Sequence, residues 1–135
     1  MSYFCKILRE MEYSHKEEIL QILRKIEETI EKIERRNRSI HTVDDYLLSE
    51  AGMEKLDAAC MLIQTIGENV KVVDYKTKGE LFSHYPQIPW KRVMGMRDYI
   101  SHHYDGVDAD VVFEVIRHNL PPLLDAIKII IHDIG

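Results

Sequence analysis

The stretch "SHKEEILQILRKIEETIEKIERR", residues 14–36, repeats its large apolar side chains at steps of three or four residues. These positions are Ile19, Ile22, Leu23, Ile26, Ile30 and Ile33. The spacing places them on one face of an α-helix, so the stretch predicts a long amphipathic helix. Ser14 and Glu17 form an S-x-x-E pattern that predicts its start. Arg35 and Arg36 fall near its C-terminus, where cations are favoured, and we prefer this role for them over RNA binding.

A second long helix is predicted in the middle of the chain. Its apolar positions are Leu56, Ala59, Ile63, Ile66, Val70 and Val73. Gly52 is expected to break the chain ahead of this helix. Thr42 and Asp45 form a weaker capping pair that predicts a short helix before the break. The segment "YKTKGELFSHYPQI", residues 75–88, is predicted to be a loop.

The second half of the chain predicts further helices. Pro89 is expected at the first position of one, Asp108 as the cap of the next, and Asn119 as the cap of the last. Pro121 and Pro122 fall in the first turn of that last helix. The apolar positions are Trp90, Val93, Met94 and Ile100, then Val111, Val112, Val115 and Ile116, then Leu123, Leu124, Ile127, Ile130, Ile131 and Ile134. No segment has the period of a convincing strand, so we predict an all-α bundle of four to six helices.

Length and composition fit one domain, and residues 1–135 are predicted to form it. Residues 1–13 share the helical spacing and are expected to extend the first helix or to form a separate arm. The net charge of −5 argues against a broad nucleic-acid-coating surface but leaves room for a small basic pocket. Cys5 and Cys60 lie far apart, and we find neither a membrane-spanning run nor an export signal. We therefore expect a cytoplasmic protein with no membrane partner.

The densest group of chemically active side chains is "RDYISHHY", residues 97–104. Arg97 has a charged planar fork that suits phosphate oxygens, and His102 can exchange protons near neutral pH. Together they suit metal-free cleavage of RNA, with His102 removing the ribose 2′-OH proton and Arg97 stabilising phosphoryl charge. On an ideal helix Tyr104 lies within about 20° of Arg97, but His102 lies roughly 140° away. The helix must therefore end or distort before His102, or a second surface must complete the pocket.

Simpler roles compete with this interpretation. An arginine and a histidine near a helix end are commonly solvated or capping residues. His102 and His103 point to different faces of a helix, and no H-x3-H pattern accompanies them, so we predict no metal site. Gly67 and Gly95 are expected to permit close helix packing and do not form phosphate-binding loops.

Three segments carry a resemblance to a known family. The spacing Arg97-x4-His102-x-Tyr104 is similar to the R-x4-H-x-Y motif of the HepT-like toxins, a branch of the HEPN superfamily. "YPQIPWKRVMGMRDYISHHYDGVD", residues 85–108, resembles the family's motif region almost throughout, and "IGENV" and "HNLPPLLDAI" resemble its flanking helices. The resemblance covers residues 14–132. Asp98 stands where the family often has Asn, and Asp105 where it often has an aromatic residue.

The resemblance implies a homodimeric HEPN-type bundle whose two motifs face each other in a shared cleft. It implies a metal-independent endoribonuclease toxin that needs no cofactor, with Arg97 and His102 catalytic and Asp98 and Ser101 in supporting or orienting roles. It also implies a partner, a minimal (MNT-type) nucleotidyltransferase antitoxin that transfers AMP to Tyr104. The alternative is a non-catalytic helical subunit that binds substrate for a nucleotidyltransferase, and a third option is a dimeric helical protein with a vestigial site.

Overall fold

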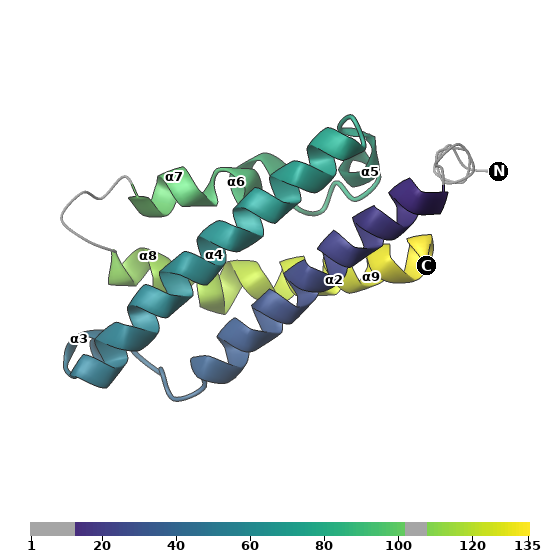
Figure 1. Ribbon diagram of the computed structural model, residues 1–135. Coiled ribbons are helices and arrows are strands. Elements are labelled where there is room, and N and C mark those ends of the chain that lie inside the picture. The colour runs from purple at the N-terminus through teal and green to yellow at the C-terminus, as the bar shows by residue number, and fades with distance from the viewer. Residues whose placement is uncertain (1–12, 102–107) are drawn as a thin grey trace.

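A computed structural model describes residues 13–101 and 108–135, and every regular element within them is helical (Figure 1). The elements are α2 (Tyr13–Arg36), α3 (Asp44–Leu47), α4 (Glu50–Lys76), α5 (Glu80–Ser83), α6 (Trp90–Met94), α7 (Met96–Ser101), α8 (Ala109–Glu114), the π-helical turn η1 (Val115–Asn119) and α9 (Leu120–Ile134). The predicted all-α class is confirmed. The predicted arm or extension at residues 1–13 lies outside the described residues, apart from Tyr13, which is in α2. None of the described helices is both long and apolar enough to span a membrane.

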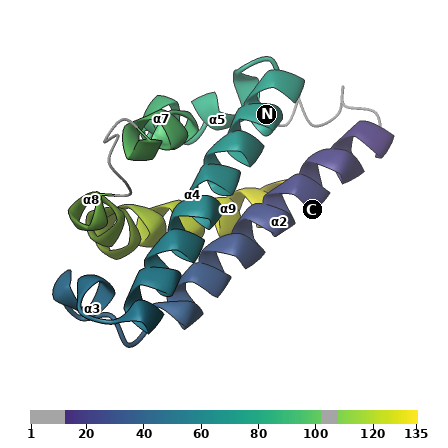
Figure 2. The ribbon, with the colours of Figure 1, turned by 60° about the vertical axis from the view of Figure 1, so that its left-hand side comes forward.

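The long helices α2, α4 and α9 form the body of the bundle (Figures 1 and 2). Helix α2 packs against both α4 and α9, while α6 and α7 lie along a different side of α4. The apolar face predicted for α2 is buried, with Ile22 at its margin, and the six apolar positions predicted for α4 are buried as well. These faces form one core, because burial of apolar surface is the main force that holds amphipathic helices together.

The start of α4 differs from the prediction. Gly52 does not break the chain but lies in the first turn of α4, where Ser49 Oγ accepts a hydrogen bond from its N–H at 2.9 Å. A Cβ at this position would collide with the carbonyl oxygen of Asp45. Glycine is therefore needed so that α3 can approach the α4 backbone. The predicted cap at Ser14 is also wrong, because Ser14 lies inside α2.

The predicted helix from Pro89 to Ile100 is divided into α6 and α7 at Gly95. Pro89 is the residue before α6 rather than its first residue. Close packing at Gly67 is confirmed, because a Cβ there would lie 2.9 Å from the Val93 carbonyl oxygen. The same prediction is wrong for Gly95, whose nearest atoms belong to the preceding turn of its own segment.

The C-terminal helices follow each other without the predicted cap at Asn119. Asp108 does cap α8, since its Oδ1 accepts from the N–H groups of Asp110 at 3.0 Å and Val111 at 3.3 Å. Asn119 is helical and makes no side-chain cap; it ends the wide turn η1, in which the Leu120 N–H donates to the Val115 carbonyl. Pro121 and Pro122 follow Leu120 and have no N–H with which to continue the α-helical hydrogen bonds, which accounts for the wide turn η1.

The predicted loop at residues 75–88 also contains helical structure. Helix α4 continues to Lys76, and α5 buries Leu81 and Phe82. The Phe82 ring stacks on Trp90 with centroids 3.9 Å apart, so this segment adds to the core beside α6. Before α3, Asp45 Oδ2 accepts from the His41 and Thr42 N–H groups at 2.7 and 3.1 Å. The predicted capping pair is therefore only half formed, because Val43 is the N-cap of α3 and no side chain caps that helix.

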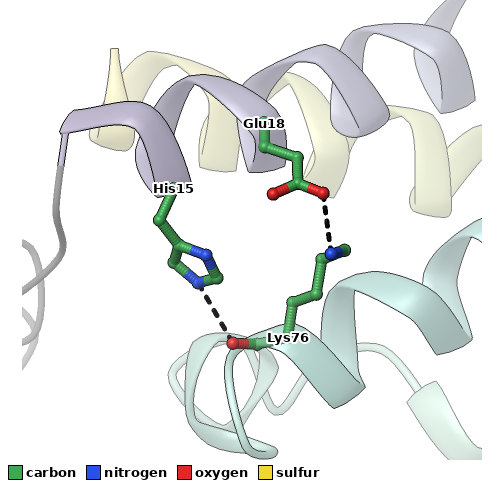
Figure 3. A network of polar contacts seen from close by, with 3 residues as sticks. All are labelled: His15, Glu18 and Lys76. Carbon is green, nitrogen blue, oxygen red and sulfur yellow. Dashed lines mark hydrogen bonds and ion pairs between the residues drawn. The ribbon is translucent and has the colours of Figure 1, made fainter.

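A polar network joins the beginning of α2 to the end of α4 (Figure 3). His15 Nε2 donates to the Lys76 carbonyl oxygen at 3.1 Å, and Lys76 Nζ lies 2.7 Å from Glu18 Oε1. The hydrogen bond from Lys76 lowers the pKa of the Glu18 carboxyl. A carbonyl can only accept, so the Nε2 of His15 carries the proton in this contact.

Candidate functional site

Helix α7 presents the first residue of the motif to solvent. Met96 and Ile100, four residues apart, are buried and hold α7 against α4. The three residues between them, Arg97, Asp98 and Tyr99, are exposed. The buried pair thus fixes the helix while the charged and aromatic groups face outward. This arrangement suits a site that meets a large external partner.

Arg97 forms an ion pair with Glu68 of α4. The Arg97 Nη1 lies 3.5 Å from the Glu68 Oε1, and the two side chains are 62% and 47% exposed. Gly67 precedes Glu68, and because it has no Cβ, α4 can come close to the α6–α7 junction. Such an exposed pair contributes at most about 1 kcal/mol to stability, so its main consequence is the direction in which the guanidinium points.

Glu68 was not among the site residues predicted from the sequence. A single glutamate on a polar helix face gives no local sign of function. Its position directly after Gly67 within "IGENV", one of the segments that resemble the HepT-like family, was the available signal.

The structure describes only part of the predicted constellation. Arg97 and Asp98 lie side by side on α7. Ser101 ends α7 as described, and nothing is described of its side chain. His102 and Tyr104 lie outside the described residues, so their geometry relative to Arg97 stays a prediction.

An exposed stripe runs along α4 through Glu68. Its members are Met61, Glu68, Val72 and Tyr75, which are exposed, and Thr65, which is half-buried, and we call this set the α4 stripe. The steps between them alternate between four and three residues, which keeps them on one face of the helix. Met61 is 70% and Tyr75 is 85% exposed, which is unusual for large apolar side chains. Tyr99 of α7, also exposed, follows Arg97 by two residues.

Other reactive groups in the described part of the chain do not form a competing site. The Cys60 thiol is buried, and burial raises its pKa, which leaves it protonated and weakly nucleophilic. Among residues 13–101 and 108–135, no three His, Cys, Asp or Glu side chains lie together in a way that could hold a metal ion.

Comparison with known proteins gives a consistent result. A family model described as "Ribonuclease HepT-like" matches residues 19–130. A Thermococcus cleftensis protein named "Probable ribonuclease HepT" is 32% identical over 115 residues, which cover 84% of this chain and 92% of the relative. A Methanocaldococcus jannaschii protein named "Putative RNase" is 29% identical over 93 residues, which cover 69% of this chain and 71% of the relative.

A second Methanocaldococcus jannaschii protein has a compound name, "Gamma-glutamylcyclotransferase and putative RNase". It is 32% identical over 112 residues, or 83% of this chain, but the chain spans only 47% of that relative. No solved structure matches the chain.

Proposed function

Because the chain belongs to the ribonuclease HepT-like family, we propose that it is a metal-independent endoribonuclease that cuts RNA with Arg97 and His102. The family match covers most of the chain and confirms the ribonuclease class predicted from the sequence. The roles of the individual residues, the dimer and the toxin activity are parts of the proposal.

The proposed reaction uses the RNA's own ribose as the nucleophile. His102 takes the proton from the 2′-OH, and the 2′ oxygen attacks the adjacent phosphorus. Arg97 donates hydrogen bonds to the non-bridging oxygens as negative charge grows on them. The bond to the 5′ oxygen breaks, that oxygen takes a proton from water as it leaves, and His102 returns its proton to solvent. The products are a 2′,3′-cyclic phosphate and a 5′-hydroxyl end.

The observation that carries the proposal is the placement of Arg97. Its helix is anchored by Met96 and Ile100, and its guanidinium is exposed and paired with Glu68. An exposed arginine whose side chain is oriented by a carboxylate of a neighbouring helix can bind an RNA phosphate at the protein surface. Asp98, the next residue, can orient neighbouring groups by hydrogen bonding.

The proposed active form is a homodimer that packs around the α4 stripe. Met61, Val72 and Tyr75 expose apolar surface that a second copy of the chain would cover. The stripe also contains Glu68, so a twofold axis close to it would bring two Arg97 side chains towards one cleft. Such a cleft answers the geometric problem that Arg97 and His102 diverge on one regular helix.

We further infer a toxin role, with an MNT-type nucleotidyltransferase as antitoxin and Tyr104 as its AMP acceptor. An AMP group on Tyr104 would bring a phosphate close to the Arg97 fork and compete with RNA. Expression of the chain alone should then arrest growth, and Arg97→Ala should relieve the arrest.

A non-catalytic partner subunit is the second candidate. One observation favours it: Arg97 is accompanied by two carboxylates, Glu68 as its ion-pair partner and Asp98 as its neighbour, which repel an RNA phosphate. Under this alternative the purified chain would leave RNA intact and would instead raise the activity of a nucleotidyltransferase.

RNA cleavage by the purified chain tests the proposed function directly. Arg97→Ala and His102→Ala should each lower the cleavage rate by about 10²–10⁴-fold, the usual contribution of a positioned acid–base or charge-stabilising group. Arg92→Ala, outside the motif, and His103→Ala, at the unspecified position between His102 and Tyr104, are matched controls and should retain activity. Cleavage should persist in EDTA and leave cyclic-phosphate ends. Equal rates in wild type and Arg97→Ala would reject the proposal.

A further inference from the structure

A cavity of about 300 Å³ lies away from α7, between the C-terminal end of α2, the segment before α3, and the α8–η1 junction. Among its lining residues are Glu34, Arg38, His41, Tyr46, Phe113 and Arg117. Arg38, His41 and Arg117 are exposed, so the cavity opens to solvent on this side.

The wide turn η1 builds one wall of the cavity. Phe113 and Arg117 are four residues apart across the α8–η1 junction, and the Arg117 guanidinium carbon lies 5.1 Å from the centroid of the Phe113 ring. Arg117 Nη1 also donates to the His41 carbonyl oxygen at 3.3 Å. These two contacts hold the guanidinium in place and leave most of its five N–H donors for a ligand.

The opposite wall comes from the end of α2. Asn37 is buried there and anchors the segment, because it donates to the Ile33 carbonyl at 2.7 Å and accepts from the Tyr46 hydroxyl at 2.6 Å. Arg38 is the next residue and is exposed. Its side chain makes no hydrogen bond or ion pair within residues 13–101 and 108–135, so its charge is available.

The charge of the cavity favours an anion. The cavity lining contains two arginines, Arg38 and Arg117, and one carboxylate, that of Glu34. Asp45, close by in the chain, directs its carboxylate to the His41 and Thr42 amides, and these hydrogen bonds lower its pKa. The chain as a whole carries a net charge of −5, so a polyanion needs local positive sites in order to bind.

We propose that this cavity is a second RNA-binding site, which holds a backbone phosphate of the strand outside the cleavage motif. The inference rests on the proposed function in that RNA is taken as the substrate. In both views α8 lies between α7, the helix of Arg97, and α3, the helix whose Tyr46 lines the cavity (Figures 1 and 2). A strand that leaves the cleavage motif would pass α8 to reach Arg38 and Arg117.

Binding of a cleavage-resistant RNA tests this site without relying on catalysis. The probe is a fluorescent oligonucleotide with 2′-O-methyl riboses, titrated at several salt concentrations. Arg38→Ala should weaken binding about three- to tenfold and reduce the slope of log K against log salt by about 0.7, the value for one phosphate contact on a single strand. Arg117→Lys, which keeps the charge but loses the planar fork, should weaken binding less.

Arg24→Ala is the matched control. Arg24 is an exposed arginine on α2, the helix that ends two residues before Arg38, and its side chain makes no hydrogen bond or ion pair in the described part of the chain. The Arg24→Ala variant also removes one positive charge, but at a position away from the cavity. Its RNA affinity and its salt slope should therefore equal those of wild type. Thermal melts should show Arg38→Ala and Arg24→Ala folded, since neither side chain makes such a contact to lose. Arg117→Lys should also be folded, because the groups that it would leave without their partner are on the surface or only half-buried.

A titration with AMP separates a strand site from a pocket for a free phosphate. Binding of AMP that wild type shows and Arg38→Ala loses, with RNA affinity unchanged, would overturn the strand proposal. Equal RNA affinities and salt slopes for Arg38→Ala and Arg24→Ala would overturn it too. So would an Arg38→Ala variant that no longer binds the nucleotidyltransferase but still binds RNA as well as wild type.

Cleavage measured in parallel keeps the two proposals distinguishable. If wild type cleaves RNA but Arg38→Ala binds it normally, this inference fails and the proposed ribonuclease stands. If Arg38→Ala weakens RNA binding but Arg97→Ala does not change cleavage, the second site stands and the proposed catalytic role fails.

Discussion

Arg97 Nη1 and Glu68 Oε1 lie 3.5 Å apart across the contact between α7 and α4. The pair joins the segment that carries the proposed catalytic motif to the C-terminal third of α4, the longest described helix. Because Glu68 also lies in the α4 stripe, one residue links the orientation of Arg97 to the proposed dimer surface. A change at Glu68 should therefore affect catalysis more than stability.

Glu68→Gln should separate RNA binding from turnover. Loss of the carboxylate removes a competitor of the phosphate, so RNA should bind more tightly, while a less well oriented Arg97 should lower kcat by about three- to tenfold. Stability should change by less than about 1 kcal/mol, as expected for an exposed pair. Single-turnover kinetics and melts provide the measurements, and Glu54→Gln, also exposed on α4, is the control. Unchanged kcat and unchanged affinity would mean that the pair has no part in catalysis.

Charges placed on the α4 stripe should separate the dimer. Val72→Lys combined with Tyr75→Lys places two cations on the surface that we propose is buried between copies, so the chain should sediment near 15.9 kDa and lose cleavage. Ile129→Lys adds a cation at another exposed apolar position, on α9, and should keep the wild-type mass and activity. A Val72→Lys/Tyr75→Lys protein that remains dimeric would place the interface elsewhere.

Tyr104→Phe should escape silencing by the nucleotidyltransferase. The substitution keeps the ring but removes the hydroxyl that would accept AMP, so intact mass after co-expression should show no adduct and RNA cleavage should continue. Tyr99→Phe, which removes the exposed hydroxyl on α7, should still be modified. An adduct mapped to Tyr99 or Tyr85 but not to Tyr104 contradicts the assignment.

Gly52→Ala should destabilise the bundle, whereas Gly95→Ala should not. A Cβ on Gly52 would collide with the backbone carbonyl of Asp45, which cannot move without displacing α3, so we expect a loss of about 1–3 kcal/mol. At Gly95 the nearest atom to a new Cβ is 3.4 Å away, and φ is −90°, which alanine tolerates. Urea midpoints compare the two variants. Equal midpoints would show that α3 can move away from α4.

Apolar periodicity was sufficient to identify the long helices, since each periodic position in α2 and α4 is buried or borders the core. The errors arose where the signal of a single residue was outweighed by its surroundings, either a tertiary contact or the residues that follow it. Gly52 is a helix breaker by propensity, but its missing Cβ is what allows α3 to pack. Asn119 is a good cap by type, but the prolines that follow it are accommodated by a wide turn in a continuous helical path.

The candidate site was predictable only in the residues that lie together in the sequence. Arg97 and Asp98 stand out because they belong to a short cluster of chemically active side chains. Glu68 and the cavity near Arg38 depend on contacts between distant segments. The pairing of Arg117 with the His41 carbonyl, for instance, joins residues that are far apart in the chain.

The packing of α9 on α2 has a consequence for when the protein becomes complete during its synthesis. A ribosome releases the chain from its N-terminus, so α2 emerges first and waits for α9 to cover one of its sides. The motif at residues 97–104 is also translated before α9. A nascent chain therefore holds the residues that we propose cut RNA before α9 can complete the bundle.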